Sequence, residues 1–110
     1  AEESANKTWT MDELMEHGKS VYATSCAACH QANGEGIPNV FPGLKGSAVA
    51  VGDIAKHIDV IVNGVPGTAM QAFGPQLNDA DIAALVTYER NAWGNDVGDM
   101  AQPADIKAAR

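Results

Sequence analysis

The stretch that decides the fold is Cys26-Ala27-Ala28-Cys29-His30. A C-x-x-C-H run is typical of the attachment site of c-type haem. Two thiols three residues apart can each add to one vinyl group of the porphyrin, and the following histidine then lies beneath the iron as an axial ligand. The chain has 2 cysteines in all, so neither is spare. The sequence therefore predicts one haem c, held covalently through Cys26 and Cys29, with His30 bound to the iron.

Two other uses of paired cysteines fit the sequence less well. A thioredoxin-type dithiol is expected between a strand and a helix, without a histidine directly after it. A structural zinc site needs four ligands, and the sequence offers no second pair at a typical spacing. The haem interpretation is favoured over both.

Helix signals precede the motif. Thr10 and Glu13 have the spacing of a capping box, and Trp9 and Leu14 occupy the two positions of a hydrophobic staple. A helix is therefore expected from this point up to the haem motif. Its apolar stripe, at helical spacing, consists of Leu14, Gly18, Val21 and Tyr22.

Loops and helices alternate after the motif. Residues 31–52 are rich in glycine and proline and are expected to form a loop. A second helix is expected over 53–63, with Asp53 as N-cap and Gly64 as the C-terminal stop. Residues 65–76 read as a further loop.

A third helix and the domain boundaries complete the expected organisation. Asn78 is expected to cap this helix and Gly94 to end it. We expect a linker over 1–8, a domain that holds the haem over 9–95 and a polar C-terminal tail over 96–110 with little to bury. No strand pattern is visible, so the predicted fold class is all-α, with about three main helices and long loops around one haem.

The second axial ligand is predicted to be Met70. It stands in a loop bracketed by glycine and proline, Gly67 to Gly74, which can carry a side chain to the far face of a porphyrin. Methionine is also a common core filler. The other candidates are less well placed by the pattern, because they lie on expected helices or in the tail: Met11, Met15, Met100, His17 and His57. We expect His17 at the surface and His57 in a structural role.

Composition excludes some partners and suggests a compartment. The net charge of −7 argues against nucleic acid, since no basic patch could neutralise phosphates. No apolar run reaches the length of a membrane span. Haem attachment to such a motif takes place outside the cytoplasm, so we expect an exported domain. We expect this domain to be monomeric. We further expect a signal or membrane anchor upstream of Ala1, so that the membrane is reached only through a parent chain.

From Thr10 to Gly94 the chain resembles a class I cytochrome c. Gly18 and Tyr22 precede the motif as the family's first-helix glycine and aromatic residue do, and Leu85 and Tyr88 resemble the pair that crosses them. The run Phe41-Pro42-Gly43-Leu44 resembles the family's proline loop. The resemblance implies that the Pro42 carbonyl accepts a hydrogen bond from the His30 ring, and that Met70 is the distal ligand.

The expected haem-binding residues therefore come from the motif and from the resemblance together. Ile37 and Val40 are read in two ways: they either surround an exposed haem edge where partners dock, or simply pack against the porphyrin. The full expected set is Cys26, Cys29, His30, Met70, Pro42, Leu44, Tyr22, Ile37 and Val40, with His30 and Met70 as the metal ligands.

A narrower resemblance suggests a parent complex. The segments 37–46, 88–95 and 102–106 are similar to the cytochrome c domain fused to subunit II of some bacterial haem-copper oxidases. This implies that the domain takes electrons from a donor protein and passes them to the copper centre of a terminal cytochrome c oxidase. Alternatives are a free-standing periplasmic carrier, the cytochrome domain of a dehydrogenase, or a haem protein with an open site for ligand binding or catalysis.

Overall fold

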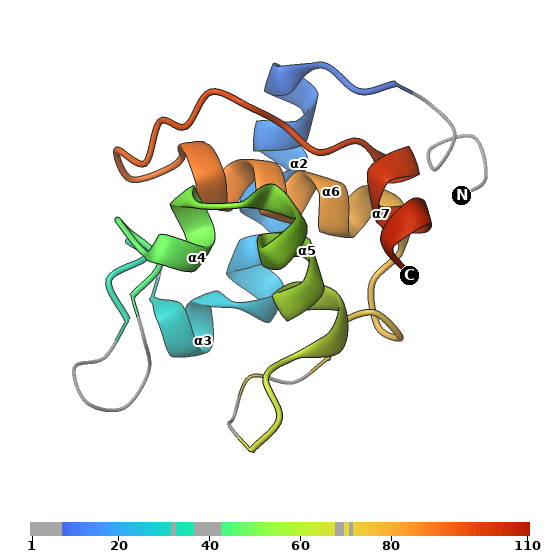
Figure 1. Ribbon diagram of the computed structural model, residues 1–110. Coiled ribbons are helices and arrows are strands. Elements are labelled where there is room, and N and C mark those ends of the chain that lie inside the picture. The colour runs from blue at the N-terminus through green and yellow to red at the C-terminus, as the bar shows by residue number, and fades with distance from the viewer. Residues whose placement is uncertain (1–7, 32, 37–42, 68–69, 71) are drawn as a thin grey trace.

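The computed structural model describes residues 8–31, 33–36, 43–67, 70 and 72–110, and within these ranges all regular elements are helices. They are α2 (Met11–Ser25), α3 (Ala27–His30), α4 (Ala48–Val51), α5 (Ile54–Asn63), α6 (Asp79–Asn91) and α7 (Pro103–Ala109), shown in Figure 1. The longest described helix has 15 residues. None of the described helices is long and apolar enough to cross a membrane. The expected all-α class is confirmed.

Helix α2 begins where its capping box predicts. The backbone N–H of Glu13 donates to the Thr10 hydroxyl (3.2 Å), and the Thr10 N–H donates to the Glu13 carboxylate (2.9 Å). These two bonds satisfy donors that the first turn of a helix leaves unpaired. Leu14, Gly18 and Tyr22 then form the buried face of the helix.

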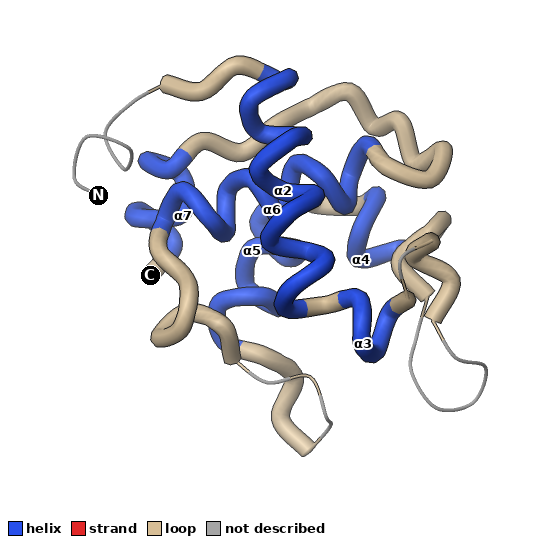
Figure 2. Tube along the Cα trace, turned by 180° about the vertical axis from the view of Figure 1, so that it is seen from behind, coloured by secondary structure: helices blue, strands red, loops and turns tan. Residues whose placement is uncertain are grey.

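The packing of α2 against α6 is the most extensive contact between helices, and it depends on Gly18. A side-chain carbon at position 18 would overlap the Ala84 carbonyl oxygen and lie 2.6 Å from the Cβ of Tyr88. Only glycine lets the two backbones approach this closely. Seen from the two opposite sides in Figures 1 and 2, α6 lies between α2 and α5.

Helix α5 occupies the range expected from its end signals. Asp53 accepts a hydrogen bond from the Ala55 N–H (3.2 Å), and the Gly64 N–H donates to the Val60 carbonyl (2.9 Å). Its buried residues are His57, Ile58, Ile61 and Val62. The apolar members of this set join the core formed with α2 and α6.

Two boundaries differ from expectation. The segment 31–52 was expected to be loop throughout, yet α4 forms within it because Ser47 acts as a local cap: its hydroxyl accepts from Ala50 N–H (3.4 Å). Helix α6 ends at Asn91 rather than at Gly94, because Ala92 is extended and Trp93 takes a positive φ of 57°.

The expectation that 96–110 has little to bury is wrong. Ala101 and Ile106 are fully buried, and α7 packs against α6 and α5. Pro103 starts this helix at a position where a missing N–H costs nothing. The three buried apolar residues, Ala101, Pro103 and Ile106, stand among polar neighbours and were too few to reveal this contact in the sequence.

Candidate functional site

The cysteine motif lies at the joint between α2 and α3. The Cys26 N–H donates to the Tyr22 carbonyl (2.9 Å), and the His30 N–H donates to the Cys26 carbonyl (2.9 Å). Cys26 and His30 are thus one helical turn apart on the same side of the backbone. Cys26 is 6% exposed and His30 is half-buried. The helix also carries the backbone of Cys29 between them, so the three positions expected to hold the cofactor share one turn.

The segment after the motif is tied back onto it. The Tyr22 hydroxyl donates to the Gln31 carbonyl (2.6 Å), and the Gly36 N–H donates to the His30 carbonyl (2.8 Å). Gln31 stops α3 by taking a positive φ of 67°. Burial, and then the charge of nearby Glu89, raises the pKa of the Tyr22 hydroxyl, which therefore stays protonated as the donor.

An aromatic cluster covers this segment. The rings of Tyr22, Tyr88 and Trp93 pack in tilted or edge-on geometry, with centroids 5.0 to 5.6 Å apart. The Trp93 ring lies directly against Gly34, where a side-chain carbon would come within 2.5 Å of it. Gly34 also has a φ of +71°, so both its conformation and its surroundings require glycine. The cluster holds the segment that follows His30 against α2 and α6.

Met70 lies in a loop that is pinned at both ends. Within the loop, the Val65 N–H donates to the Met70 carbonyl (3.0 Å). The Phe73 and Gly74 N–H groups donate to the carbonyls of Ile61 (2.9 Å) and Val62 (3.1 Å) at the end of α5. Met70 is half-buried and packs against the same core cluster that contains Cys26 and Tyr22. In Figures 1 and 2, α3 and the loop after α5 lie at the same end of the molecule.

Of the remaining expected residues, Leu44 packs against this core cluster, as does Ala27. Pro42, Ile37 and Val40 lie outside the described residues, so the expected bond from the His30 ring to Pro42 stays a prediction. His17 is half-buried on α2 and lies 2.7 Å from Asp81 of α6.

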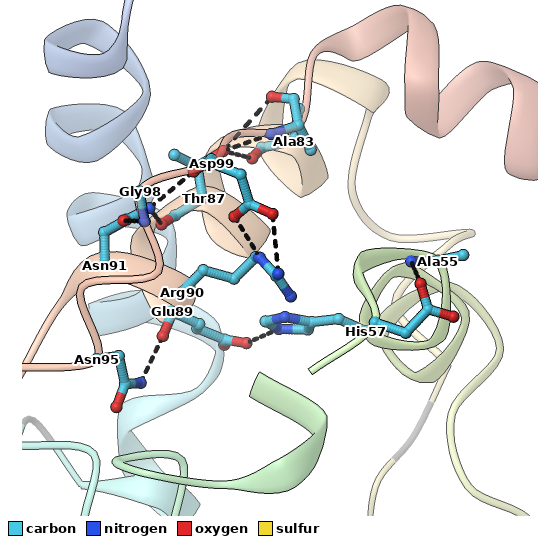
Figure 3. A network of polar contacts seen from close by, with 12 residues as sticks. Ala55, His57, Ala83, Thr87, Glu89, Arg90, Asn91, Asn95, Gly98 and Asp99 are labelled. Carbon is cyan, nitrogen blue, oxygen red and sulfur yellow. Dashed lines mark hydrogen bonds and ion pairs between the residues drawn. The ribbon is translucent and has the colours of Figure 1, made fainter. Parts of the chain in front are cut away.

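His57 is held in a buried polar network that the sequence analysis did not find. Its Nε2 lies 2.7 Å from the Glu89 carboxylate, and both side chains are almost wholly buried. Figure 3 shows this pair beside Arg90, which forms a bidentate ion pair with Asp99 (2.6 and 2.9 Å). The Arg90 guanidinium points toward the His57 ring. Glu89 and Arg90 are adjacent charged residues near the end of α6, a pattern typical of a solvated surface, so the sequence signal for this network is limited to its charge complementarity.

The role of Asn95 in holding the loop that carries Leu44 was also not predicted. Its side-chain amide donates to the Leu44 (3.2 Å) and Glu89 (2.7 Å) carbonyls, and its oxygen accepts from the Gly46 N–H (2.7 Å). One side chain thus joins the loop that carries Leu44 to the end of α6. The sequence did contain one signal for this role, because Asn95 ends the run from Tyr88 that resembles the cytochrome domain fused to oxidase subunit II.

The donor set present fits a covalently attached haem. One helical turn carries both cysteine positions and an imidazole, and the Met70 thioether, in the loop after α5, packs against the core cluster that includes Cys26. Thiols can hold the porphyrin through its vinyl groups, and imidazole with thioether is a ligand pair that haem iron accepts.

Comparison with known proteins decides the family. Residues 13–88 match the model described as cytochrome c oxidase, cbb3-type, subunit III. The chain belongs to this c-type cytochrome family. The cofactor of this cytochrome is haem c, with the covalent attachment typical of the family, and its function is electron transfer.

Several known proteins are similar to the cytochrome. It is 32% identical to the gluconate 2-dehydrogenase cytochrome c subunit of Pantoea cypripedii, over 96% of this chain and 26% of that protein. It is 37% identical to the cbb3-type oxidase subunit CcoP of Azospirillum brasilense, over 83% of this chain and 32% of that subunit. Among solved structures, dihydro-haem d1 dehydrogenase NirN matches 69% of this chain and 16% of its own, with 36% identity and a TM-score of 0.61.

The cytochrome therefore spans about a quarter to a third of these two relatives. Both are subunits of redox enzymes by name, so the expectation of redox protein partners is supported at that level. The family model describes subunit III of cbb3-type oxidases, whereas the sequence analysis singled out the domain fused to subunit II. The subunit II assignment stays a prediction.

Proposed function

We propose that this cytochrome relays single electrons between redox proteins through a haem held between His30 and Met70. The observation that carries the proposal is that Met70 and Cys26 both contact the hydrophobic core, while α3 and the loop after α5 lie at the same end of the molecule. When bound, the haem supplies a one-electron ferric–ferrous couple, at a higher potential with His/Met than with bis-His ligation.

The protein residues would exclude water and small ligands from the haem and hold the His30 segment in place. If His30 and Met70 both bind the iron, no coordination position would be left for oxygen or another small ligand. The buried apolar cluster around Cys26 keeps water from the attachment side. The bond from Tyr22 to Gln31 and the cluster of Tyr22, Tyr88 and Trp93 hold the His30 segment in one position. These features favour electron transfer over an open site for ligand binding or catalysis.

Met70→Ala tests the ligand assignment. We expect the variant to show a lower reduction potential and to bind carbon monoxide rapidly and stoichiometrically when reduced, because the sixth position is open. Met100→Ala is the matched control, since Met100 is 42% exposed in the tail. If Met70→Ala leaves the spectrum and the potential unchanged, the ligand is another residue and the proposal fails at this point.

The electron acceptor that we propose is a copper centre. The electrons would pass to the copper centre of a terminal cytochrome c oxidase on the periplasmic side of a bacterial inner membrane. Fusion to a parent chain would replace a diffusional encounter with a high effective concentration. A second candidate is the cytochrome domain of a dehydrogenase, which is favoured by the match to the gluconate 2-dehydrogenase subunit over 96% of the chain.

The intact mass and N-terminus of the native polypeptide distinguish these candidates. A long chain with membrane spans and copper ligands ahead of Ala1 would identify an oxidase subunit. A long chain that carries further C-x-x-C-H motifs and co-purifies with a dehydrogenase would favour the second candidate. A chain little larger than 110 residues plus one haem would indicate a free-standing carrier.

A further inference from the structure

The side chain of Arg110, directly after α7, has three acceptors, two on the turn that precedes α6 and one on the first residue of α6. Its Nη1 donates to the Gly74 carbonyl (2.7 Å) and its Nη2 to the Leu77 carbonyl (2.8 Å). Its Nε donates to the Asp79 carboxylate (2.6 Å). One guanidinium thus ties the C-terminal helix to three points of a segment more than thirty residues away. In Figures 1 and 2 the C-terminus lies beside this turn.

The turn is continuous with the loop that carries Met70. Gly74 is held from two sides, since its N–H donates to Val62 of α5 (3.1 Å) and its carbonyl accepts from Arg110. The backbone approaches α5 closely here, because a side-chain carbon on Gly74 would lie 2.9 Å from the Val62 carbonyl oxygen. The C-terminal end of the Met70 loop is therefore held twice, by the end of α5 through Phe73 and Gly74 and by Arg110 through the Gly74 carbonyl.

We propose that Arg110 is a positioning residue for Met70, and this rests on the proposed function. A loop whose ends are both fixed samples few conformations, so its thioether leaves the distal position rarely. When the guanidinium bonds are removed, the segment 72–78 keeps its bonds to α5 but loses those to α7. Local opening of the loop then becomes easier while the remaining core stays packed. The C-terminal helix acts as a strap on the distal ligand.

The test compares Arg110→Ala with the unchanged holoprotein in its reduced form. Met70 must leave before carbon monoxide can bind, so the rate of carbon monoxide binding reports the opening of the loop. We expect this rate to rise about tenfold or more, the scale set by losing charge-assisted hydrogen bonds. Arg110→Lys keeps the charge but not the fork of donors, so it should restore the rate only in part. Lys107→Ala, at an exposed position on the same helix, is the matched control.

A denaturant unfolding curve is recorded for each variant beside the rate. A merely structural role would lower the stability of Arg110→Ala and leave the carbon monoxide rate equal to that of Lys107→Ala, which overturns the inference. If Arg110→Ala does not fold, the same comparison is made with Arg110→Lys, and an unchanged rate again overturns it. Rapid binding by the unchanged protein would instead contradict Met70 ligation, and thus the proposed function itself.

Discussion

At the scale of single residues, burial decides how much each of two similar contacts contributes to the stability of the fold. His57 lies 2.7 Å from Glu89, and His17 lies 2.7 Å from Asp81. The side chains of the first pair are 2% and 5% exposed, and those of the second are 38% and 25% exposed. Water cannot replace a lost partner inside the core, whereas it can at the surface. Equal distances should therefore give unequal energies.

We expect His57→Ala to lower the free energy of unfolding by about 3 kcal/mol or more, because Glu89 is left buried without its partner. His17→Ala, the matched variant, should cost less than about 1 kcal/mol. Chemical denaturation of the holoprotein measures both. Equal losses would show that the buried pair stabilises the fold no more than the exposed pair does.

The buried Tyr22 hydroxyl should make the stability of the fold depend on pH in the alkaline range. Burial first, and then the charge of Glu89, raises the pKa of its hydroxyl above the ordinary 10.0. The unfolded chain therefore releases this proton at a lower pH than the folded chain does. Stability should be unaffected below about pH 9 and should fall as pH rises through about 10 and above.

Tyr22→Phe tests that sign. The variant should lose about 1 kcal/mol at neutral pH, for the missing bond to Gln31, and should show a flatter decline above pH 10. Burial raises the pKa of Tyr88 as well, so part of the decline should remain. Unfolding curves at a series of pH values would contradict this account if the two proteins declined in parallel.

At the scale of elements, the crossing of α2 and α6 is set by one missing side chain. Alanine is a better helix former than glycine by about 1 kcal/mol, which favours Gly18→Ala. The added carbon, however, would meet the Ala84 backbone, which cannot rotate away. Overpacking against a fixed backbone outweighs the gain in propensity, so we expect a net loss of about 2 kcal/mol. Thermal or chemical unfolding measures it.

Lys19→Ala provides the control for the crossing. Lys19 is the exposed neighbour on the same helix, and its replacement should change stability by less than about 0.5 kcal/mol. If Gly18→Ala were as stable as Lys19→Ala, the two helices would have to separate without cost. The close approach would then not be needed for the fold.

At the scale of the whole molecule, the net charge of −7 bears on how partners meet it. If the partner presents a basic surface, the second-order rate of electron transfer should fall steeply as ionic strength rises, because salt screens the attraction. Stopped-flow measurements from low to physiological salt check this. A rate that does not change with salt would assign docking to apolar contacts, such as those expected around Ile37 and Val40.

The sequence by itself determined those features that depend on neighbouring residues. The haem motif is five consecutive residues, and each capping box spans four, as with Thr10 and Glu13 or Asn78 and Asp81. Their bonds close within one helical turn, so the starts of α2 and α6 and the end of α5 at Gly64 could be predicted from spacing alone. The all-α class followed from the same local patterns.

Only the tertiary structure decided what distant segments do together. The pairing of His57 with Glu89 and the three bonds of Arg110 join residues that are 31 to 36 positions apart in the sequence. The burial of Ile106 likewise depends on the packing of α7 against α5 and α6. Each partner taken alone has the pattern of an ordinary surface or tail residue. Their roles arise because folding brings them out of water against one another, and single-residue patterns do not contain that information.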